Sequence, residues 1–249
     1  MRISYAITVC NEFVEIQKLI SFLLENKREE DEIIVLYDSN KGTQEVLKYL
    51  EEKYQQECIK LYKEGFENHF GNWKNKLKSY CTGKYIFQID ADEIPSKFLI
   101  DKLPIILEAN ISIEAFLVPR VNTVDNITKE HIEQWRWNIS KLESMVEEKE
   151  LDLRKIKDVE EYNLLKHYNL IIEETDKTIK YYKPIINWCD FQWRIWRNLD
   201  DIKWVHKVHE RLEGFKTFGE LPYNTVDFAL YHPKTIERQE KQNKYYDTL

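Results

Sequence analysis

The chain has 249 residues, of which 43% are hydrophobic and 13% are aromatic. This length and composition predict a globular protein with one substantial core and exclude an intrinsically disordered chain. The net charge of -7 gives no general basic surface of the kind that nucleic-acid binding requires, although a local basic groove stays open.

The cysteines and the apolar runs indicate the cellular compartment of the protein. Four cysteines lie far apart and form neither a CxxC motif nor a zinc-ligand spacing, which is typical of a reducing compartment. The first residues run directly into a strand-like segment, so we expect no secretory signal. No apolar run is long enough to span a bilayer. The sequence therefore predicts a cytoplasmic protein with no integral membrane segment.

Strand-like and helix-like segments alternate through the first third of the chain. Apolar, β-branched runs predict strands over 3–10, 31–39, 58–64 and 84–90. Amphipathic spacing predicts helices over 11–26, 46–54 and 73–83. Such alternation predicts parallel strands with right-handed crossovers, as in a Rossmann-like half. Because no GxGxxG follows the first strand, we exclude a dehydrogenase that binds NAD or FAD.

The rest of the chain changes texture twice. A helix over 101–110, with Pro104 in its first turn, and a strand over 114–124 are predicted first. Dense mixed charge over 128–183 then predicts a helical insertion, with apolar residues at helical spacing: Leu142, Met145, Val146, Leu153 and Ile156. Sheet-like patterns return from 184, and a polar helix ends the chain. The predicted parts are a nucleotide-sugar-binding half (1–127), an insertion on the acceptor side (128–183) and a completing half (184–249).

An acidic run follows the fourth predicted strand. Asp90, Asp92 and Glu93 stand at the C-terminal end of "YIFQID", and two carboxylates one residue apart in extended chain point the same way. Such a pair favours a shared cation, and oxygen ligands favour Mg or Mn. The alternative is an ordinary helix start, with Asp92 or Glu93 in the first turn, Pro95 near N1 and Ser96 as the cap.

Polar residues also end the first two predicted strands. Asn11 and Glu12 follow the first strand, and Asp38 ends the second. Because the carboxyl ends of strands in a doubly wound sheet meet over one crevice, we expect these residues to line a pocket together with Asp90 and Asp92. Glu12 is counted with the donor-binding residues.

At this point the sequence resembles the family 2 glycosyltransferases of the GT-A fold, in particular a branch with "DADE" that includes lipopolysaccharide core glucosyltransferases. The resemblance rests on the order and spacing of several stretches, the sharpest being "IDADE" after "N-x7-G". The others include "ITVCNE", "DEIIVLYDSNKGT", "FLVPRVN", "FQWRIWRN", "VHKVHE" and "LYHPKTIERQEKQNKYY". The implied fold is α/β, a mostly parallel central sheet flanked by helices, with a helical insertion.

The resemblance implies a metal-dependent, inverting, hexosyltransferase-like enzyme that uses a nucleotide-sugar, and we expect a UDP-sugar. Thr8 and Cys10 would flank the base, and Asp38 would accept a hydrogen bond from it. Lys74 and Asn75 would lie near the nucleotide, where the family often has Arg-Asn.

The resemblance also assigns the metal. Asp90 would approach the ribose and the sugar, and Asp92 would bind the Mn or Mg ion that bridges the diphosphate. "VHKVHE" would supply His209 to the metal or diphosphate and Glu210 as the general base. Asp190, in "WCDFQWR", is the competing base.

Arginines and tryptophans of the C-terminal half are harder to assign. Arg194 either steadies phosphate or lies on the surface, and Trp193 and Trp196 are predicted to be core residues. Trp135, Trp137 and Trp188 bracket the insertion and form a candidate acceptor platform.

Two rival functions stay open. One is a nucleotidylyltransferase of the same fold, although that class usually has a Gly-rich basic loop where this chain has "VCNEF". The other is a non-catalytic module that binds a nucleotide or sugar. The acceptor is also open between a glycan, a protein, a metabolite and a modified DNA base, as is the oligomeric state.

Overall fold

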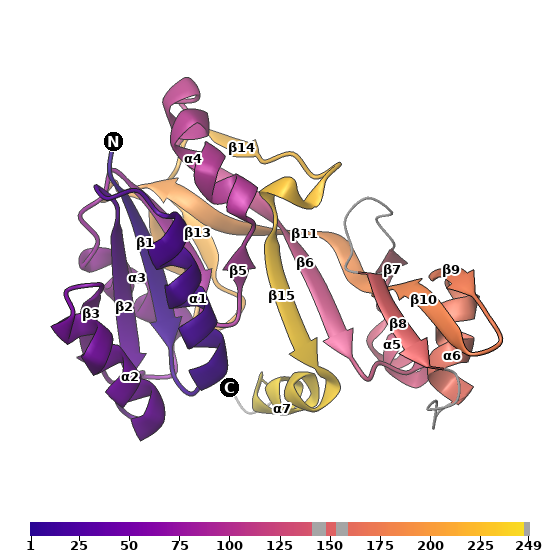
Figure 1. The fold of residues 1–249 in the computed structure, drawn as a ribbon. Coiled ribbons are helices and arrows are strands. Elements are labelled where there is room, and N and C mark those ends of the chain that lie inside the picture. The colour runs from indigo at the N-terminus through magenta and orange to yellow at the C-terminus, as the bar shows by residue number, and fades with distance from the viewer. Residues whose placement is uncertain (141–147, 153–158, 247–249) are drawn as a thin grey trace. The chain divides into compact units, whose positions relative to one another are not determined.

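The computed structural model describes residues 1–140, 148–152 and 159–246. The chain forms two compact units (Figure 1). Unit 1 comprises Met1–Val118 and Phe191–Leu221, and unit 2 comprises the described residues of Pro119–Asp190 and Pro222–Thr248. The chain leaves unit 1 within one strand and returns within another, and the functional division predicted at 127 and 183 stays a prediction.

A parallel sheet forms the centre of unit 1, in the order β3-β2-β1-β4. Its strands are β1 (Ile3–Val9), β2 (Glu32–Asp38), β3 (Lys60–Glu64) and β4 (Tyr85–Asp90). The end of β11 (Ile185–Arg197) adds an antiparallel strand, with Ile195 opposite Phe87. The three inner strands are buried along almost their whole length, which agrees with their continuous apolar runs.

Four helices connect these strands or follow them: α1 (Phe13–Asn26), α2 (Gln44–Gln55), α3 (Phe70–Ser79) and α4 (Lys97–Ala109). Each buries one stripe, for example Ile16, Leu19 and Leu23 of α1. The first two match the predicted helices closely. The position predicted for Pro104 is wrong, because α4 begins at Lys97 and Pro104 lies inside the helix.

Short strands complete unit 1. The stretch "IKWVHKVHERLEG" forms a hairpin, in which β12 (Lys203–Val205) pairs with β13 (Arg211–Glu213). β14 (Phe218–Glu220) runs parallel to the start of β6 (Ala115–Asp125). β5 (Ile94–Pro95) lies between β4 and α4 in the sequence.

Unit 2 is built around the remainder of β6. β15 (Leu230–Thr235) runs parallel to it, with Leu230 opposite Arg120. β7 (Ile139–Ser140) pairs with the first residues of β11. The helical elements of this unit are α5 (Lys129–Trp135), α6 (Val159–His167), the 3-10 turn η1 (Val226–Phe228) and α7 (Ile236–Tyr246).

The predicted helical insertion contains helices and also a sheet. α5 and α6 lie within 128–183, but β8 (Glu148–Asp152), β10 (Thr178–Tyr182) and β9 (Ile171–Glu174) form an antiparallel sheet in the order β8-β10-β9. In β10 the buried Ile179 and Tyr181 alternate with polar residues, and this short period was hidden among the charges. Of the predicted apolar stripe, Leu142, Met145, Val146, Leu153 and Ile156 lie outside the described residues.

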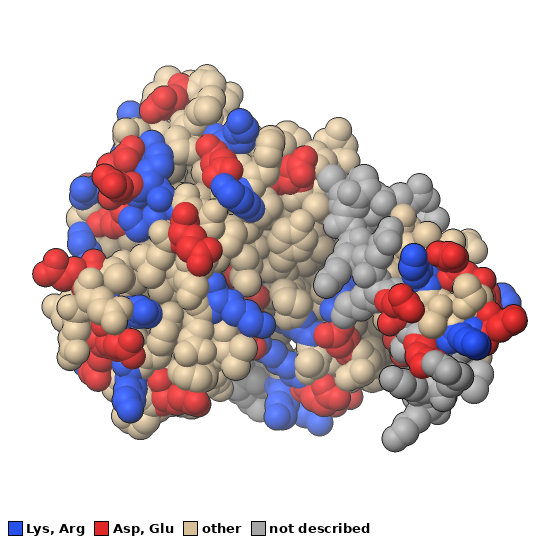
Figure 2. Space-filling view, in the orientation of Figure 1, with Lys and Arg blue, Asp and Glu red and all other residues tan. Residues whose placement is uncertain are grey.

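Two further observations concern the helices and the charged side chains of the described residues. None of their helices combines the length and the apolar character needed to cross a membrane. On the face shown in Figure 2, the drawn Lys and Arg side chains lie among Asp and Glu side chains and form no extended basic patch.

Candidate functional site

The acidic run after β4 forms a closed turn over residues 90–93, called the locked turn below. The Glu93 N–H donates to the Asp90 carbonyl at 2.9 Å, and the Asp90 N–H donates to Glu93 Oε2 at 3.1 Å. Glu93 is fully buried. The cap predicted at Ser96 is correct, since its hydroxyl accepts from the Leu99 N–H at 3.0 Å. Because α4 begins at Lys97, Asp92 and Glu93 lie before the helix and not in its first turn.

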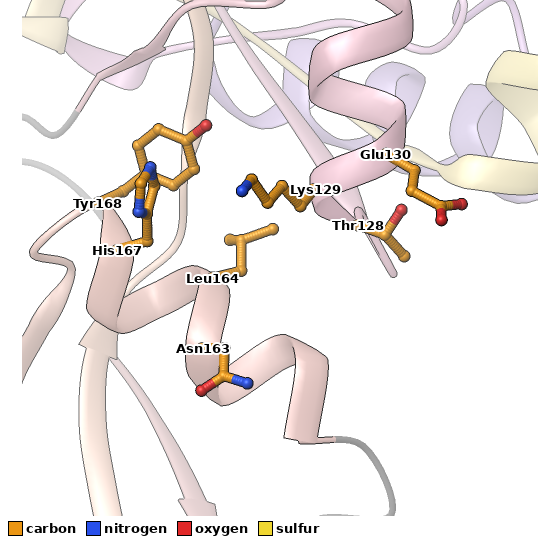
Figure 3. A pocket seen from close by; sticks show the side chains of 7 residues that line it. All are labelled: Thr128, Lys129, Glu130, Asn163, Leu164, His167 and Tyr168. Atoms are coloured by element: carbon orange, nitrogen blue, oxygen red, sulfur yellow. The ribbon is translucent and has the colours of Figure 1, made fainter.

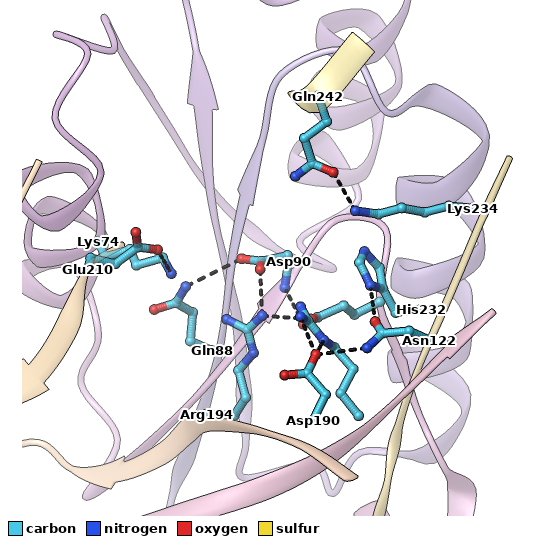
Figure 4. A network of polar contacts seen from close by, with 12 residues as sticks. Lys74, Gln88, Asp90, Asn122, Asp190, Arg194, Glu210, His232, Lys234 and Gln242 are labelled. Atoms are coloured by element: carbon cyan, nitrogen blue, oxygen red, sulfur yellow. Dashed lines mark hydrogen bonds and ion pairs between the residues drawn. The ribbon is translucent and has the colours of Figure 1, made fainter. Parts of the chain in front are cut away.

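Arg194 joins the two ends of this turn (Figure 4). Its Nη2 donates to Asp90 Oδ2 and to Glu93 Oε1, both at 2.6 Å, and its side chain is only 3% exposed. Burial raises the pKa of Asp90, but the charges of Arg194 and Lys74 outweigh burial and lower that pKa to about 2. Burial likewise lowers the pKa of Arg194, and the two acids raise it by more. Asp90 is therefore ionised at neutral pH and is already paired with the Arg194 guanidinium.

The ends of β1 and β2 form a second polar group in unit 1. Asp38 is buried, and its Oδ1 accepts from the N–H groups of Asn40 at 2.9 Å and Phe66 at 3.1 Å. The Cys10 thiol lies 3.8 Å from Asp38 Oδ2, and the Cys10 N–H donates to Glu12 Oε2 at 2.8 Å. Burial, then Asp38, raises the pKa of Cys10 to about 12, so this thiol stays neutral.

Thr8 lies next to this group in the sheet. It is half-buried on β1, opposite Leu36 of β2 and Asp90 of β4. The structure therefore brings Cys10 together with Glu12 and Asp38, and Thr8 lies two residues before Cys10 on β1. Their binding to a nucleotide stays a prediction.

Helix α3 holds the β12–β13 hairpin. The Asn75 side chain donates to the Trp204 carbonyl and accepts from the Trp204 N–H, both at 2.8 Å. The N–H groups of Phe70 and Gly71 donate to the carbonyls of Lys207 at 2.9 Å and His206 at 3.2 Å. A side chain at Gly71 would meet that carbonyl, since its Cβ would lie 2.6 Å from the His206 oxygen. The Asn75 amide is thus used to position the hairpin.

Lys74 links the same helix to the predicted base. Its ammonium forms an ion pair with Glu210 Oε1 (Figure 4). It also lies 4.3 Å from the centroid of the Trp204 ring. The side chains of Lys74 and Glu210 are 9% and 19% exposed. Glu210 is therefore held in one place by a nearly buried cation.

The three predicted metal ligands are not gathered. Among the described residues, no group of three or more His, Cys, Asp and Glu side chains is arranged to hold a metal ion. Asp90 is engaged by Arg194, and His209 is exposed in the hairpin turn with a left-handed φ of 52°. That His209 shares a metal with Asp90 and Asp92 stays a prediction.

A smaller ligand set still fits the chemistry of the site. Mg and Mn bound with a nucleotide take one or two protein carboxylates and complete their shell with phosphate oxygens and water. Asp92 is a half-buried residue of the locked turn and supplies such a carboxylate. The residues present therefore fit a metal that is held jointly by Asp92 and a diphosphate.

Asp190, the competing base, belongs to a network within unit 2 (Figure 4). Its Oδ2 accepts from Arg120 Nε at 2.9 Å, Arg120 Nη2 at 2.5 Å and Asn122 Nδ2 at 2.8 Å. Asn122 Oδ1 lies 2.7 Å from His232 Nδ1. Because the Asn122 amide nitrogen donates to Asp190, its oxygen must accept, and His232 carries its proton on Nδ1.

Residues 4–157 match the family model described as glycosyl transferase family 2. The chain belongs to glycosyl transferase family 2. Two structures of S. aureus TarS 1-349 resemble this family 2 protein, one solved alone and one in complex with UDP-GlcNAc. Their TM-scores are 0.55 and 0.54 at 14% identity, over 94% of this chain. None of the curated proteins matches the sequence.

At this identity the likeness to TarS shows the fold alone. It confirms the predicted GT-A fold, an α/β fold in which a central sheet is flanked by helices. This family 2 chain spans 60% and 58% of the two TarS chains that it matches.

The sequence did not single out several residues of these networks. Glu93 was noticed only as a member of the acidic run, yet it closes the turn and holds Arg194. Arg120 and Asn122 gave no signal, although both lie in the quoted stretch "FLVPRVN" and have every-other-residue spacing on β6.

Of the tryptophans whose roles were predicted from the sequence, Trp196 is fully buried and the others are partly buried. Trp196 is a core residue and packs on Trp204, as predicted, and Trp193 packs on Phe215. Trp135 and Trp137 lie in contact, with ring centroids 4.7 Å apart. Trp188 packs in a different cluster, with Val121, Ile185, Val226 and Ala229, so the proposed platform of three tryptophans is not formed as one cluster.

Proposed function

We propose that this protein transfers a sugar from a nucleotide-sugar to a hydroxyl acceptor, with inversion and with Mg or Mn as cofactor. The donor that we propose is a UDP-sugar. Membership in glycosyl transferase family 2 supports the reaction class. The observation that carries the proposal is the locked turn, in which Glu93 and Arg194 fix Asp90 beside Asp92 at the end of β4. The resemblance to lipopolysaccharide core glucosyltransferases through "DADE" stays part of this proposal.

The donor is proposed to bind at the strand ends of unit 1. Thr8, Cys10 and Asp38 would contact the base, with Glu12 fixing the loop after β1. Lys74 and Asp90 would lie toward the diphosphate and the sugar. Asp92 would hold the metal, which when bound offsets the charge that develops on the departing nucleoside diphosphate. The neighbouring TarS protein was solved with UDP-GlcNAc, which supports a UDP-sugar as the first donor to test.

The chemical step needs a carboxylate that accepts a proton. The acceptor hydroxyl oxygen forms a bond to the anomeric carbon from the face opposite the diphosphate while the bond to that diphosphate breaks. The hydroxyl proton passes to the base, for which we propose Glu210, with Asp190 as the alternative. Each is held by a cation, Lys74 and Arg120 respectively, so each is fixed in position.

The test is a pair of Asp→Asn variants. Asp92→Asn is expected to reduce UDP release from a UDP-sugar by at least about a hundredfold, because one metal carboxylate is lost. Asp101→Asn is the matched control, since Asp101 is an exposed α4 residue that pairs with Lys97. Unchanged turnover in a folded Asp92→Asn protein would remove the metal role. Circular dichroism and the unfolding midpoint confirm that both variants fold.

A non-catalytic nucleotide-binding module is the second candidate. One observation favours it. The two cations whose charges act on Asp90, Lys74 and Arg194, are already paired with carboxylates. Thermal shifts separate the two functions. Stabilisation by UDP that requires Mn, together with sugar transfer or release, supports the enzyme, whereas stabilisation without turnover with any acceptor supports the module.

A further inference from the structure

A pocket within unit 2 is lined by residues of α5 and α6 and by residues next to them in the sequence (Figure 3). Its volume is about 380 Å³, within the range of roughly 300–1,000 Å³ that is usual for small-molecule sites. The lining comes from the start of α5 and from the second half of α6 with the residue that follows it: Thr128, Lys129, Glu130, Asn163, Leu164, His167 and Tyr168.

Both walls of the pocket are supported from behind. At the start of α5, the His131 N–H donates to the Thr128 hydroxyl at 3.4 Å and the Thr128 N–H donates to His131 Nδ1 at 3.2 Å, which forms a capping box. Behind α6, Leu165 packs with Leu170 and Ile179 in a small core. The lining side chains therefore project from fixed backbone.

The polar side chains of the pocket are open to solvent, since Glu130 and Asn163 are exposed and Tyr168 is half-buried. Within the described residues, the side chains of Glu130 and Asn163 and the hydroxyl of Tyr168 have no hydrogen-bond or ion-pair partner. Together they offer a carboxylate, an amide and a phenol, which is a mixture of donors and acceptors. Such a mixture of donors and acceptors on the lining of one cavity suits a ligand with several hydroxyls.

The remaining lining selects against a strongly charged ligand. Lys129 supplies the only ammonium among the lining residues, and it lies 3.5 Å from Glu133, so part of its charge is already matched. Glu130 brings the opposite charge to the same cavity. The buried Leu164 and the rings of His167 and Tyr168, 4.8 Å apart and perpendicular, add apolar surface. An apolar floor with rings suits the C–H face of a pyranose, and the polar rim suits its hydroxyls.

We propose that this pocket binds a neutral sugar and serves as an acceptor-recognition subsite, a role that rests on the proposed glycosyl transfer. The sugar places its hydroxyls against Glu130, Asn163 and Tyr168 and its C–H face against the Leu164 floor. The Glu130 carboxylate carries the largest share of recognition, because hydrogen bonds to a charged group are stronger than those to neutral ones.

The test is saturation-transfer NMR on the whole protein, with methyl α-D-glucopyranoside, methyl β-D-galactopyranoside and N-acetylglucosamine as probes. At least one glycoside is expected to receive saturation. Glu130→Gln is expected to raise its dissociation constant about tenfold, and Tyr168→Phe about fivefold. Glu133→Gln is the matched control on the same helix, since its exposed carboxylate faces Lys129 and does not line the pocket, and it should bind as the parent does.

Three results would overturn the proposal: no saturation of any of the three glycosides, equal binding by all variants, or displacement of the glycoside by inorganic phosphate. A thermal shift with UDP and Mn on the same samples keeps the two claims apart. UDP stabilisation without glycoside binding refutes the pocket alone. Glycoside binding without any response to nucleotide refutes the acceptor role together with the proposed function.

Discussion

In unit 1, Arg194 is bonded to Asp90 and Glu93 beneath the surface, whereas in unit 2 Glu130 and Asn163 line an open pocket without a partner among the described residues. Both regions carry acids close to a proposed substrate. Only in unit 1 do the acids hold their own backbone: the Glu93 N–H donates to the Asp90 carbonyl, and the Asp90 N–H donates to the Glu93 carboxylate.

The difference matches what each region is proposed to bind. A donor diphosphate and its metal require charges that are already in place, because reorganising charged groups during the reaction raises the barrier. A sugar acceptor is recognised by neutral hydrogen bonds and ring contacts, for which partners left unsatisfied in the free protein suffice. The comparison predicts that substitutions in unit 1 cost stability and that substitutions in the pocket cost binding.

Removing Arg194 should have the largest effect. Arg194→Met leaves Asp90 and the fully buried Glu93 without their cation, and breaking a buried ion pair costs about 3–5 kcal/mol. Urea unfolding, followed by circular dichroism, measures the loss. Arg211→Met, at an exposed position of β13, should change the free energy of unfolding by less than about 0.5 kcal/mol. Equal costs for the two variants would mean that Arg194 does not organise the turn.

Acid should weaken unit 1 through Glu32. Burial raises the pKa of Glu32, but bonds from Lys60 at 2.7 Å, Ser4 at 2.6 Å and Thr82 outweigh burial and lower it from 4.5 to about 2. A carboxylate with a depressed folded pKa stabilises the fold above pH 4.5, and this contribution is lost as the pH falls toward 2. The shift corresponds to about 3 kcal/mol.

The measurement compares the parent with Glu32→Gln between pH 7 and pH 2. The parent should be the more stable by about 3 kcal/mol at pH 7, and the gap should close as the pH falls. Glu29→Gln, at an exposed position nearby, should show no comparable gap. A gap that stays constant down to pH 2 would contradict the assignment of the shift to Glu32.

Asn75→Ala should have an intermediate effect. The variant leaves the N–H and the carbonyl of the buried Trp204 without partners, at a cost of about 2 kcal/mol. Because the same hairpin carries Glu210, turnover should fall more than donor affinity does. Asn72→Ala, at an exposed position one turn earlier, should change neither quantity. Isothermal titration with UDP and initial rates separate binding from turnover, and a change confined to donor affinity would return Asn75 to a donor-binding role.

The fold of unit 1 could be predicted from the sequence because its signals are local. Buried strands such as "YIFQID" and amphipathic helices carry their own periodicity, and the strand ends that follow bring Cys10, Glu12 and Asp38 together by topology alone. What could not be predicted depends on contacts between distant segments. The partners of Asp90 and Glu210 are Arg194 and Lys74, which are 104 and 136 residues away, and no pattern within one segment encodes either pair.

Unit 2 was harder for a related reason. Its small sheet has strands such as "TIKYY", too short to distinguish from the mixed charge around them. A comparable case lies in unit 1, where the family resemblance assigned His209 to the metal or diphosphate. His206 and His209 lie there in a turn with left-handed φ values of 73° and 52°. Asn, Asp and His adopt this left-handed conformation more often than other non-glycine residues, but still rarely, so a histidine alone does not predict it.

Glu130→Gln should have the smallest effect on stability, which makes it the sharpest test of the comparison. Glu130 has no partner to lose in the described part of the chain, so the free energy of unfolding should change by less than about 0.5 kcal/mol. Urea unfolding of Glu130→Gln beside Arg194→Met therefore sets an acid that is kept for a ligand against a cation that holds the backbone. A loss above about 2 kcal/mol for Glu130→Gln would mean that this carboxylate supports the fold of unit 2, and weaker sugar binding by the variant would then reflect that damage and not a lost contact.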